Sequence, residues 1–335
     1  MAERSVTYIQ CGLGPTGCGI LRAAAERPWL RLVGAVDIAP DKVGRDVADV
    51  AGLAKPTGML VCGSLRDVPP ADLVLHSTAS HLRQVGPLLR QFIERGLNCL
   101  STAEELTWPW LSSPDLAEEL DGLARERGVR LLGAGINPGF VLDLLPMLLT
   151  VPCRKVKAIR ARRIVDTAKR RPQLQAKTGI GLTEREYRLR AAKGAIGHVG
   201  LRESVALLAS GLGWSPDKVT EMIEPVVADE PTETHHFMVR RGQVLGSRQV
   251  AVGIVDDTER LRLELALYAH APDAHDEVQL VGSPSFTVRI DGGIPGDEAT
   301  PAVVINVIPS LLAAPPGLLT AKDIIVPRWQ APRLP

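Results

Sequence analysis

The sequence predicts an α/β protein, with a doubly wound parallel sheet in its N-terminal half and an α+β domain on a mostly antiparallel sheet in its C-terminal half. Apolar runs typical of buried strands alternate with helical patterns from residue 5 to residue 150. Beyond Thr234 the strand patterns follow one another without helices between them. A helical pattern at residues 302–313 is expected to pack back onto the first domain. We therefore expect one domain at residues 1–150, completed by about residues 301–335, and a second at residues 151–300.

The first domain contains five expected strands, and glycine and proline mark where its helices begin and end. Helices are expected at residues 82–95 before Gly96 and at 114–127 between Pro114 and Gly128, because proline favours the first helical turn and glycine favours the end. An apolar helix is expected to end at Leu149. The strands are expected at residues 6–10, 30–36, 71–76, 98–101 and 129–133, with a weaker pattern at 58–61.

The pattern changes at Val151-Pro152, where the second domain is expected to begin. Its helices are expected at residues 184–193 and 201–212. Its strands are expected at residues 155–165, 237–240, 249–256, 260–270 and 278–290. Runs of strands without crossover helices favour an antiparallel sheet.

Composition excludes several classes of function. The 335 residues carry a formal net charge of +1, so we expect no partner nucleic acid or anionic membrane. The longest apolar runs, such as residues 303–308, are too short to cross a bilayer, and the first residues lack the pattern of a secretory signal. The five cysteines form no CxxC pair, and the pair His235-His236 has no acidic or cysteine partner at ligand spacing. We expect a cytoplasmic protein without a metal site.

A glycine-rich turn follows the first strand and opens a helical pattern. The turn is Gly12-Leu13-Gly14-Pro15-Thr16-Gly17. This order lets the backbone approach a pyrophosphate, which then lies on the free N–H groups and the positive dipole end of the helix. The second strand runs into Asp37, 20 residues after Gly17, where a carboxylate would accept hydrogen bonds from the adenosine ribose. The sequence therefore predicts a Rossmann-type dinucleotide site. An aspartate at this position disfavours a 2′-phosphate, so we expect NAD, with NADP possible if Lys42 or Arg45 moves in.

Three further strand ends are candidates for the rest of the site, because ligands bind beyond the carboxyl ends of the strands in such a sheet. Polar or glycine-rich chain follows the expected strands at residues 76–80, 102–105 and 135–140. We expect these segments to contribute further cofactor-binding residues. They are His76, Ser77, Thr78, Ser80, Thr102 and Asn137. A buried histidine at a strand end could equally satisfy a backbone group, and this alternative stays open for His76.

The adjacent carboxylates Glu104 and Glu105 have two interpretations. Acidic residues at the start of a helix commonly do no more than complement its dipole. A carboxylate beside a nicotinamide could instead hold an ammonium or iminium cation, or act as a general base. Only one of two adjacent side chains can point into the site. His198, which lies between two glycines before a helix, is another candidate.

Segments spread over nearly the whole chain resemble the 2,4-diaminopentanoate dehydrogenases and the native amine dehydrogenases related to them, which are relatives of dihydrodipicolinate reductase. The matching segments are CGLGPTGCGI, VGAVDIAPDKVG, LHSTAS, LSTAEELTWPW, GAGINPGFVLDLLP, LQAKTGIGLTEREY, IGHVGLRESVALLASGLGW and NVIPSLLAAPPGLLT. The chain departs from dihydrodipicolinate reductase itself, because Phe237-Met238-Val239 follow His235-His236 in place of the element that handles that enzyme's substrate.

The resemblance implies an NAD(P)-dependent amine dehydrogenase that interconverts small amines with aldehydes or ketones and ammonia. It makes Glu104 the catalytic residue and implies that Asn137 and Phe140 line the nicotinamide and substrate pocket. His198 falls in a segment near the active site, and Leu144 lies within reach of Phe140 along the expected helix. It further implies a homodimer in which the second domain supplies the interface sheet.

Two alternatives remain open at this point. One is a cofactor-binding regulator without turnover, in which Glu104 only begins a helix. The other is a dehydrogenase of a carboxylate-bearing substrate, such as 2,4-diaminopentanoate or another amino acid. Such a substrate calls for an arginine, and Arg160, Arg163 and Arg171 are the candidates.

Overall fold

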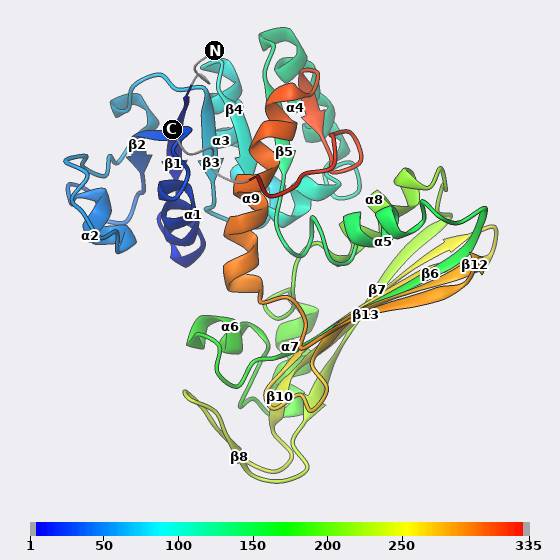
Figure 1. Cartoon of the computed structure of the whole chain (residues 1–335). Helices are drawn as coiled ribbons and strands as arrows, with labels where there is room; N and C mark the ends of the chain where they lie inside the picture. The colour runs from blue at the N-terminus through cyan, green and yellow to red at the C-terminus, as the bar shows by residue number, and fades with distance from the viewer. Residues whose placement is uncertain (1–4, 331–335) are drawn as a thin grey trace. The chain divides into compact units, whose positions relative to one another are not determined.

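The computed structural model describes residues 5–330, which divide into two compact units (Figure 1). Unit 1 runs to Gly139 and resumes at Pro295, and unit 2 is Phe140–Ile294. The chain therefore changes unit at Gly139 and at Pro295 rather than at residues 150 and 301. Pro301 lies inside a helix, α9, that belongs wholly to unit 1.

Unit 1 is a doubly wound parallel sheet of six strands, as the sequence predicts. In order across the sheet the strands are β2 (Leu30–Val36), β1 (Val6–Cys11), β3 (Leu73–His76), β4 (Asn98–Ser101), β5 (Arg130–Gly133) and β14 (Gly317–Leu319). The chain passes from β1 to β2 on one side and returns to β3 on the other side of β1. The carboxyl ends of β1 and β3 are thus the switch point where a doubly wound sheet binds its ligand.

Helices cover both faces of this sheet. One face carries α1 (Pro15–Ala25), α2 (Val47–Ala51) and α9 (Gly296–Ala313), and the other carries α3 (Leu82–Glu94) and α4 (Pro114–Arg127). Figure 1 shows α9, in orange, beside α1, in dark blue, and the two are in contact. Each face has a buried apolar core. Two single-turn helices, η1 (Leu65–Asp67) and η2 (Glu104–Thr107), lie in the connections.

Unit 2 is built on a second sheet of six strands, which is mostly antiparallel as predicted. Its order is β13 (Phe286–Asp291), β12 (His275–Ser283), β6 (Lys155–Asp166), β11 (Thr258–Tyr268), β10 (Val244–Val255) and β7 (Lys218–Val227), with β6 and β11 parallel. The helices are α5 (Leu144–Leu149), α6 (Pro172–Lys177), α7 (Glu184–Ala192) and α8 (Leu201–Gly211). A small ribbon joins β8 (Thr232–Glu233) and β9 (Met238–Val239).

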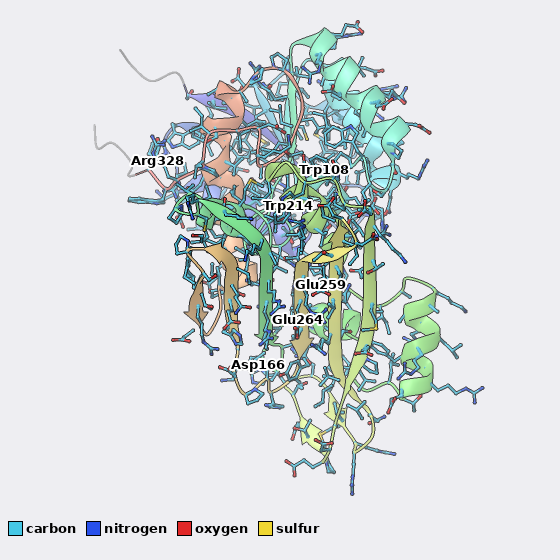
Figure 2. All side chains as sticks on the ribbon, turned by 90° about the vertical axis from the view of Figure 1, so that its right-hand side faces the viewer. Trp108, Asp166, Trp214, Glu259, Glu264 and Arg328 are labelled. Atoms are coloured by element: carbon cyan, nitrogen blue, oxygen red, sulfur yellow. The ribbon has the colours of Figure 1, made fainter. Side chains whose placement is uncertain are left out.

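The two faces of the sheet in unit 2 differ in chemistry. Helix α8 packs on one face, where a Cβ added to Gly253 would lie 2.9 Å from Val205. We call the opposite face the outer face. There Glu264 of β11 forms ion pairs with Arg248 of β10 at 2.7 Å and with Arg162 of β6 at 3.4 Å. Positive and negative side chains therefore alternate across three strands. Figure 2 looks onto the outer face, with Glu264 near its centre.

Several expected elements differ from the structure. Residues 278–290 are not one strand but the hairpin β12–β13, because Pro284 interrupts the run and cannot donate to a ladder. Residues 58–61 do not form a strand. Leu60 makes only an isolated bridge to Asp46, and Cys62, just beyond this range, makes another to Val36. Three strands were not anticipated: β7, the two-residue β8 and the three-residue β14.

Among the described residues, no helix is both long and apolar enough to cross a membrane. Within the same part of the chain, no cluster of three or more histidine, cysteine or acidic side chains could hold a metal ion.

Candidate active site

Two glycines of the turn after β1 are required by close packing within unit 1. Gly12 has a φ of +90°, and a Cβ there would overlap the carbonyl oxygen of Ser77 at the end of β3. A Cβ on Gly17 would overlap the carbonyl oxygen of Gly12. The turn can therefore bring the start of α1 this close to β1 and β3 only with glycine at both positions.

Gly14 has no such packing reason. A Cβ there would meet no atom within 4 Å, although Gly14 directly precedes α1. Pro15 occupies the first helical position, and no side chain caps the helix and no acidic residue lies in its first turn. The open space thus faces the unpaired N–H groups and the positive end of the helix dipole. This arrangement fits the pyrophosphate of a dinucleotide.

Asp37, at the end of β2, is held against the glycine turn. Its carboxylate accepts hydrogen bonds from the backbone N–H of Leu13 at 2.7 Å and of Ala39 at 2.9 Å, and Lys42 donates to it at 3.0 Å. Burial raises the pKa of Asp37, but the bonds from Ala39, Leu13 and Lys42 lower it by more, so the pKa lies below its ordinary value. The carboxylate stays ionised where the ribose of a dinucleotide would lie. The sequence analysis suggested only that Lys42 could move toward the cofactor. In the structure Lys42 forms an ion pair with Asp37.

His76 joins the ends of β3 and β4 from inside the sheet. The side chain is fully buried, with Nδ1 2.8 Å from the Ser101 hydroxyl and Nε2 2.6 Å from the Thr78 hydroxyl. Burial lowers the pKa of His76 to about 4, so the ring is neutral at physiological pH. Both ring nitrogens are bonded within unit 1, so the expected cofactor contact would have to run through Thr78.

Glu104 and Glu105, on η2 after β4, take different roles. The Glu105 carboxylate accepts from the backbone N–H of Leu82 at 2.6 Å and lies 2.8 Å from Nδ1 of His81. It thereby caps the N-terminus of α3, a different helix from η2, in whose first turn it lies. The half-buried Glu104 carboxylate has no hydrogen bond or ion pair to any other residue between 5 and 330. Of the pair, Glu104 is the carboxylate available to a ligand.

The turn after β5 is shaped by its own backbone. Gly139 has a φ of +120°, and a Cβ there would lie 2.7 Å from the backbone nitrogen of Gly135. Asn137, in a cis peptide bond to Pro138, has a buried side-chain oxygen without a hydrogen-bond partner in the described chain. This oxygen can accept a hydrogen bond from a ligand.

The remaining predicted cofactor residues lie at the ends of β3 and β4. The Ser77 hydroxyl donates to the carbonyl of Gly12 and lies 3.2 Å from the Gln10 amide, so it helps fix the glycine turn. Ser80 and Thr102 are half-buried. The sequence analysis did not assign Gln10, although a polar residue within an otherwise apolar strand marks it.

In unit 2 the predicted pocket residues are fixed by hydrogen bonds of the chain around them. Asp143 caps α5 through Leu144, which is 4% exposed, and accepts the Ser204 hydroxyl at 2.7 Å. The backbone of His198 is held on both sides by Gln249, which accepts from its N–H at 2.6 Å and donates to its carbonyl at 3.0 Å. That Phe140, Leu144 and His198 line one pocket with Glu104 stays a prediction.

Known proteins resemble this chain in sequence and in fold. A family model described as the 2,4-diaminopentanoate dehydrogenase C-terminal domain matches residues 140–332. The chain is 31% identical to the 2,4-diaminopentanoate dehydrogenase of Acetoanaerobium sticklandii over 335 residues, 96% of this chain and 94% of that protein. It shares its fold with an amine dehydrogenase from Mycobacterium smegmatis at a TM-score of 0.86, with 23% identity over 98% of this chain and 99% of that chain. The WlbA dehydrogenase of Bordetella pertussis, solved with NADH and UDP-GlcNAcA, gives a TM-score of 0.55 and 16% identity, over 87% and 75% of the two chains.

Proposed function

The chain belongs to the 2,4-diaminopentanoate dehydrogenase family, and from this membership we propose that it is an NAD(P)-dependent amine dehydrogenase. The reaction is the reductive amination of small aldehydes and ketones with ammonia, and the reverse oxidative deamination of amines. The observation that carries the proposal is the Glu104 carboxylate, left without a partner among residues 5–330 while its neighbour Glu105 caps α3. A cofactor-binding regulator without turnover would not explain why Glu104 lacks a partner in this part of the chain while Glu105 has one.

The cofactor is a nicotinamide dinucleotide, which supplies a hydride to carbon in one direction and accepts it in the other. The open space at Gly14, the uncapped start of α1 and the ionised Asp37 support dinucleotide binding. We expect NAD to be preferred because Asp37 repels a 2′-phosphate. The ion pair with Lys42 weakens that repulsion, so NADP remains a poorer substrate rather than an excluded one.

Glu104 acts on the nitrogen and oxygen of the substrate. In amination, ammonia adds to the carbonyl compound, and with the uptake of one proton and the loss of one water an iminium cation forms, which addition of a hydride would convert to the amine. The Glu104 carboxylate stabilises the cation by its negative charge, accepts a proton from the adding ammonia and returns a proton to the departing water. The same steps in reverse release ammonia from an amine.

We propose that Phe140 and Leu144 give the substrate pocket an apolar character, with Asn137 and His198 as polar groups at its edge. Apolar lining favours small hydrophobic carbonyl compounds and amines over charged ones. The buried, unpartnered oxygen of Asn137 supports a role in accepting a hydrogen bond from cofactor or substrate.

A carboxylate-bearing substrate, such as 2,4-diaminopentanoate or another amino acid, is the second candidate, because a relative named for that substrate is 31% identical. Of the three candidate arginines, Arg163 does not support it. Arg163 is 4% exposed and is bound by Asp276 at 2.7 Å and by the carbonyl of Ile294, so its charge is already paired. Arg160 is exposed on β6, and Arg171 is the candidate that remains.

A matched pair of ketones tests the function and separates the two candidates. We expect the protein to oxidise NADH with ammonia and 2-pentanone, and to form the amine. Omitting ammonia should abolish the reaction, which separates amination from reduction to an alcohol. 4-Oxopentanoate carries the same methyl ketone, with a carboxylate in place of the terminal methyl group of 2-pentanone. A strong preference for 4-oxopentanoate would assign the second candidate, and no NADH oxidation with any carbonyl compound and ammonia would refute the proposal.

A further inference from the structure

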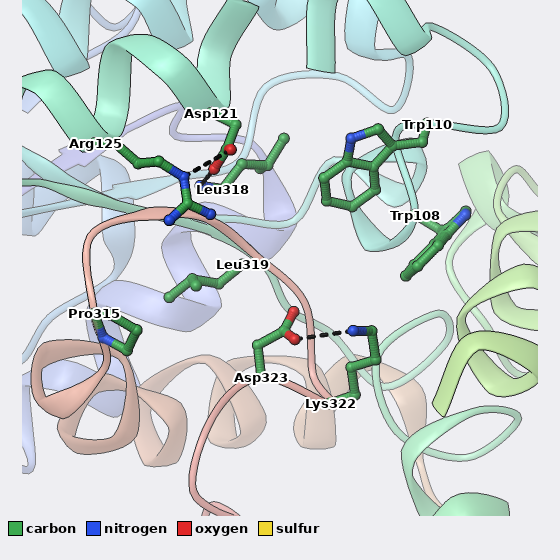
Figure 3. Close-up of a pocket in the computed structure, with 9 residues that line it drawn as sticks. All are labelled: Trp108, Trp110, Asp121, Arg125, Pro315, Leu318, Leu319, Lys322 and Asp323. Carbon is green, nitrogen blue, oxygen red and sulfur yellow. Dashed lines mark hydrogen bonds and ion pairs between the residues drawn. The ribbon is translucent and has the colours of Figure 1, made fainter. Parts of the chain in front are cut away.

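Unit 1 contains a cavity that is lined neither by the glycine turn nor by Glu104. Its volume is about 560 Å³, within the range of small-molecule sites. The cavity lies against the edge strand β14, and Figure 3 shows Trp110 and Arg125 on opposite sides of it, with Lys322 nearby. No step of the proposed reaction uses these residues, so their arrangement calls for a separate reason.

The aromatic side of the cavity consists of two indole rings. Trp108 directly follows η2, and its ring centroid lies 5.1 Å from that of Trp110 at an interplanar angle of 58°. Both side chains are only half-buried. Tilted rings of this kind accept a third aromatic ring by offset or edge-to-face contact. The aromatic side therefore favours a ligand that contains a ring.

Arg125, on α4, brings a positioned cation to the cavity. Asp121 accepts its Nε at 2.8 Å, and the other oxygen of Asp121 accepts the backbone N–H of Leu318 at 2.8 Å. The guanidinium lies on the backbone of Gly317, where a Cβ would come within 3.2 Å of its Cζ. Asp121 thus has both oxygens bonded, while the terminal nitrogens of Arg125 have no hydrogen bond to the described residues. This side of the cavity therefore offers unused guanidinium donors, while each oxygen of Asp121 already accepts one hydrogen bond.

Lys322 provides a second cation in the same way. Its Nζ donates to one oxygen of Asp323 at 3.0 Å and lies 5.9 Å from the ring centroid of Trp108. The other oxygen of Asp323 accepts the N–H and the hydroxyl of Thr320, at 2.9 and 2.6 Å. Asp323 thus accepts three hydrogen bonds, whereas Lys322 Nζ donates only one of its three protons to the described residues. The donors left over on Arg125 and Lys322 favour a ligand with a negative charge.

We propose that this cavity binds an aromatic carboxylate. The ring of the ligand packs against Trp108 and Trp110, and its carboxylate accepts hydrogen bonds from the terminal nitrogens of Arg125 and from Lys322. The planar guanidinium matches the two oxygens of a carboxylate. Trp108 follows η2 directly, so the ligand would lie at the end of the segment that carries Glu104.

Calorimetric titration of the full chain with 3-phenylpropionate tests the proposal without cofactor, amine or turnover, so its outcome is independent of the proposed function. We expect saturable binding at one site. Arg125→Gln and Trp110→Leu should each weaken the binding by about tenfold or more, the loss typical of a charge-assisted bond or an aromatic contact. Lys322→Gln is a further variant that keeps the test possible if Arg125→Gln does not fold.

Matched controls separate this cavity from general binding. Arg90→Gln removes an exposed arginine of α3 that pairs with Glu119, and Trp329→Leu removes a tryptophan that is 61% exposed outside the cavity. Both variants should bind within about twofold of the unmodified chain. The amide 3-phenylpropanamide should bind at least about tenfold more weakly than the acid. Absence of binding at millimolar concentration, equal binding of acid and amide, or unchanged binding by Arg125→Gln and Trp110→Leu would overturn the proposal.

Discussion

Burial keeps His76 neutral, and this has a consequence for stability. The pKa of His76 is about 4 in the folded chain, below the ordinary value of 6.5 that an unfolded chain restores. Between these values the unfolded state binds a proton that the folded state does not, so stability falls as pH falls from 6.5 to 4. The contribution is on the order of 3 kcal/mol. Urea unfolding at several pH values should show this decline.

The His76→Gln variant isolates the contribution, because it can keep a bond to Ser101 or Thr78 but does not titrate. We expect the variant to be less stable at neutral pH and to lose less stability than the unmodified chain between pH 6.5 and 4. Equal losses in the two proteins over this interval would show that His76 is not the titrating group.

Lys42 is expected to moderate the choice of cofactor. Without its charge, Asp37 repels a 2′-phosphate more strongly, so Lys42→Ala should increase the preference for NADH over NADPH. The pair is partly exposed, with side chains 24% and 11% accessible, so the change should be about fivefold, equivalent to about 1 kcal/mol. The ratio of kcat/KM for the two cofactors measures it. A shift toward NADPH in Lys42→Ala would contradict the assignment.

At the scale of single residues, the spacing along the chain could place the acidic pair, but only the family resemblance assigned Glu104 and Glu105 different roles. Glu105 is bound by His81 and by the N–H of Leu82, which come from a segment more than 20 residues away. Such partners depend on how β3 and β4 are paired, which spacing along the chain does not reveal. The internal bonds of His76 were hidden for the same reason, because Ser101 lies on the adjacent strand.

At the scale of the glycine turn, two similar substitutions should have opposite effects. Gly17→Ala places a Cβ on the carbonyl oxygen of Gly12, so we expect it to lower the melting temperature. Gly14 has a φ of −70°, which alanine adopts, and its Cβ meets no protein atom. Gly14→Ala should therefore fold normally but bind NADH about tenfold or more weakly, because the methyl group lies where the pyrophosphate is expected. Thermal unfolding and NADH fluorescence titration measure the two effects, and unimpaired NADH binding by Gly14→Ala would place the pyrophosphate elsewhere.

Elements with clear end signals were predicted closely, and those without them were not. Strand β4 has the expected bounds, and α4 begins at Pro114 and ends before Gly128 as expected. The strand β7 was missed because polar residues such as Lys218 and Glu221 break its alternation at the edge of the sheet. The strand β14 was missed because three residues are too few for a period to be recognised.

At the scale of the whole molecule, we propose that the chain forms a homodimer through the outer face of the sheet in unit 2. Met222, on β7, is 54% exposed on this face, beside the buried Val250. The alternation of Arg248, Glu264 and Arg162 across the strands can pair with itself in a two-fold arrangement. We expect Met222→Glu to convert a dimer to a monomer in analytical ultracentrifugation.

Met238→Glu is the matched control, because Met238 is 72% exposed but lies on the small ribbon β8–β9 rather than on the outer face. It should leave the mass unchanged. A monomeric unmodified chain, or a dimer that survives Met222→Glu, would exclude the outer face as the interface.

The central claim is that Glu104 carries the charge and the protons of the reaction. The most direct measurement compares turnover of Glu104→Gln and Glu105→Gln with ammonia, NADH and the best carbonyl substrate. Glutamine keeps the size of the side chain but removes the anion and the base, so turnover of Glu104→Gln should fall by a factor on the order of 10² to 10⁴. Its NADH binding should be nearly unchanged.

Glu105→Gln should keep its turnover, because glutamine can still accept the Leu82 N–H and the loss at the α3 dipole is under about 1 kcal/mol. Loss of turnover in Glu105→Gln with activity retained in Glu104→Gln would move the catalytic role to Glu105. Full activity in both variants would contradict the carboxylate mechanism.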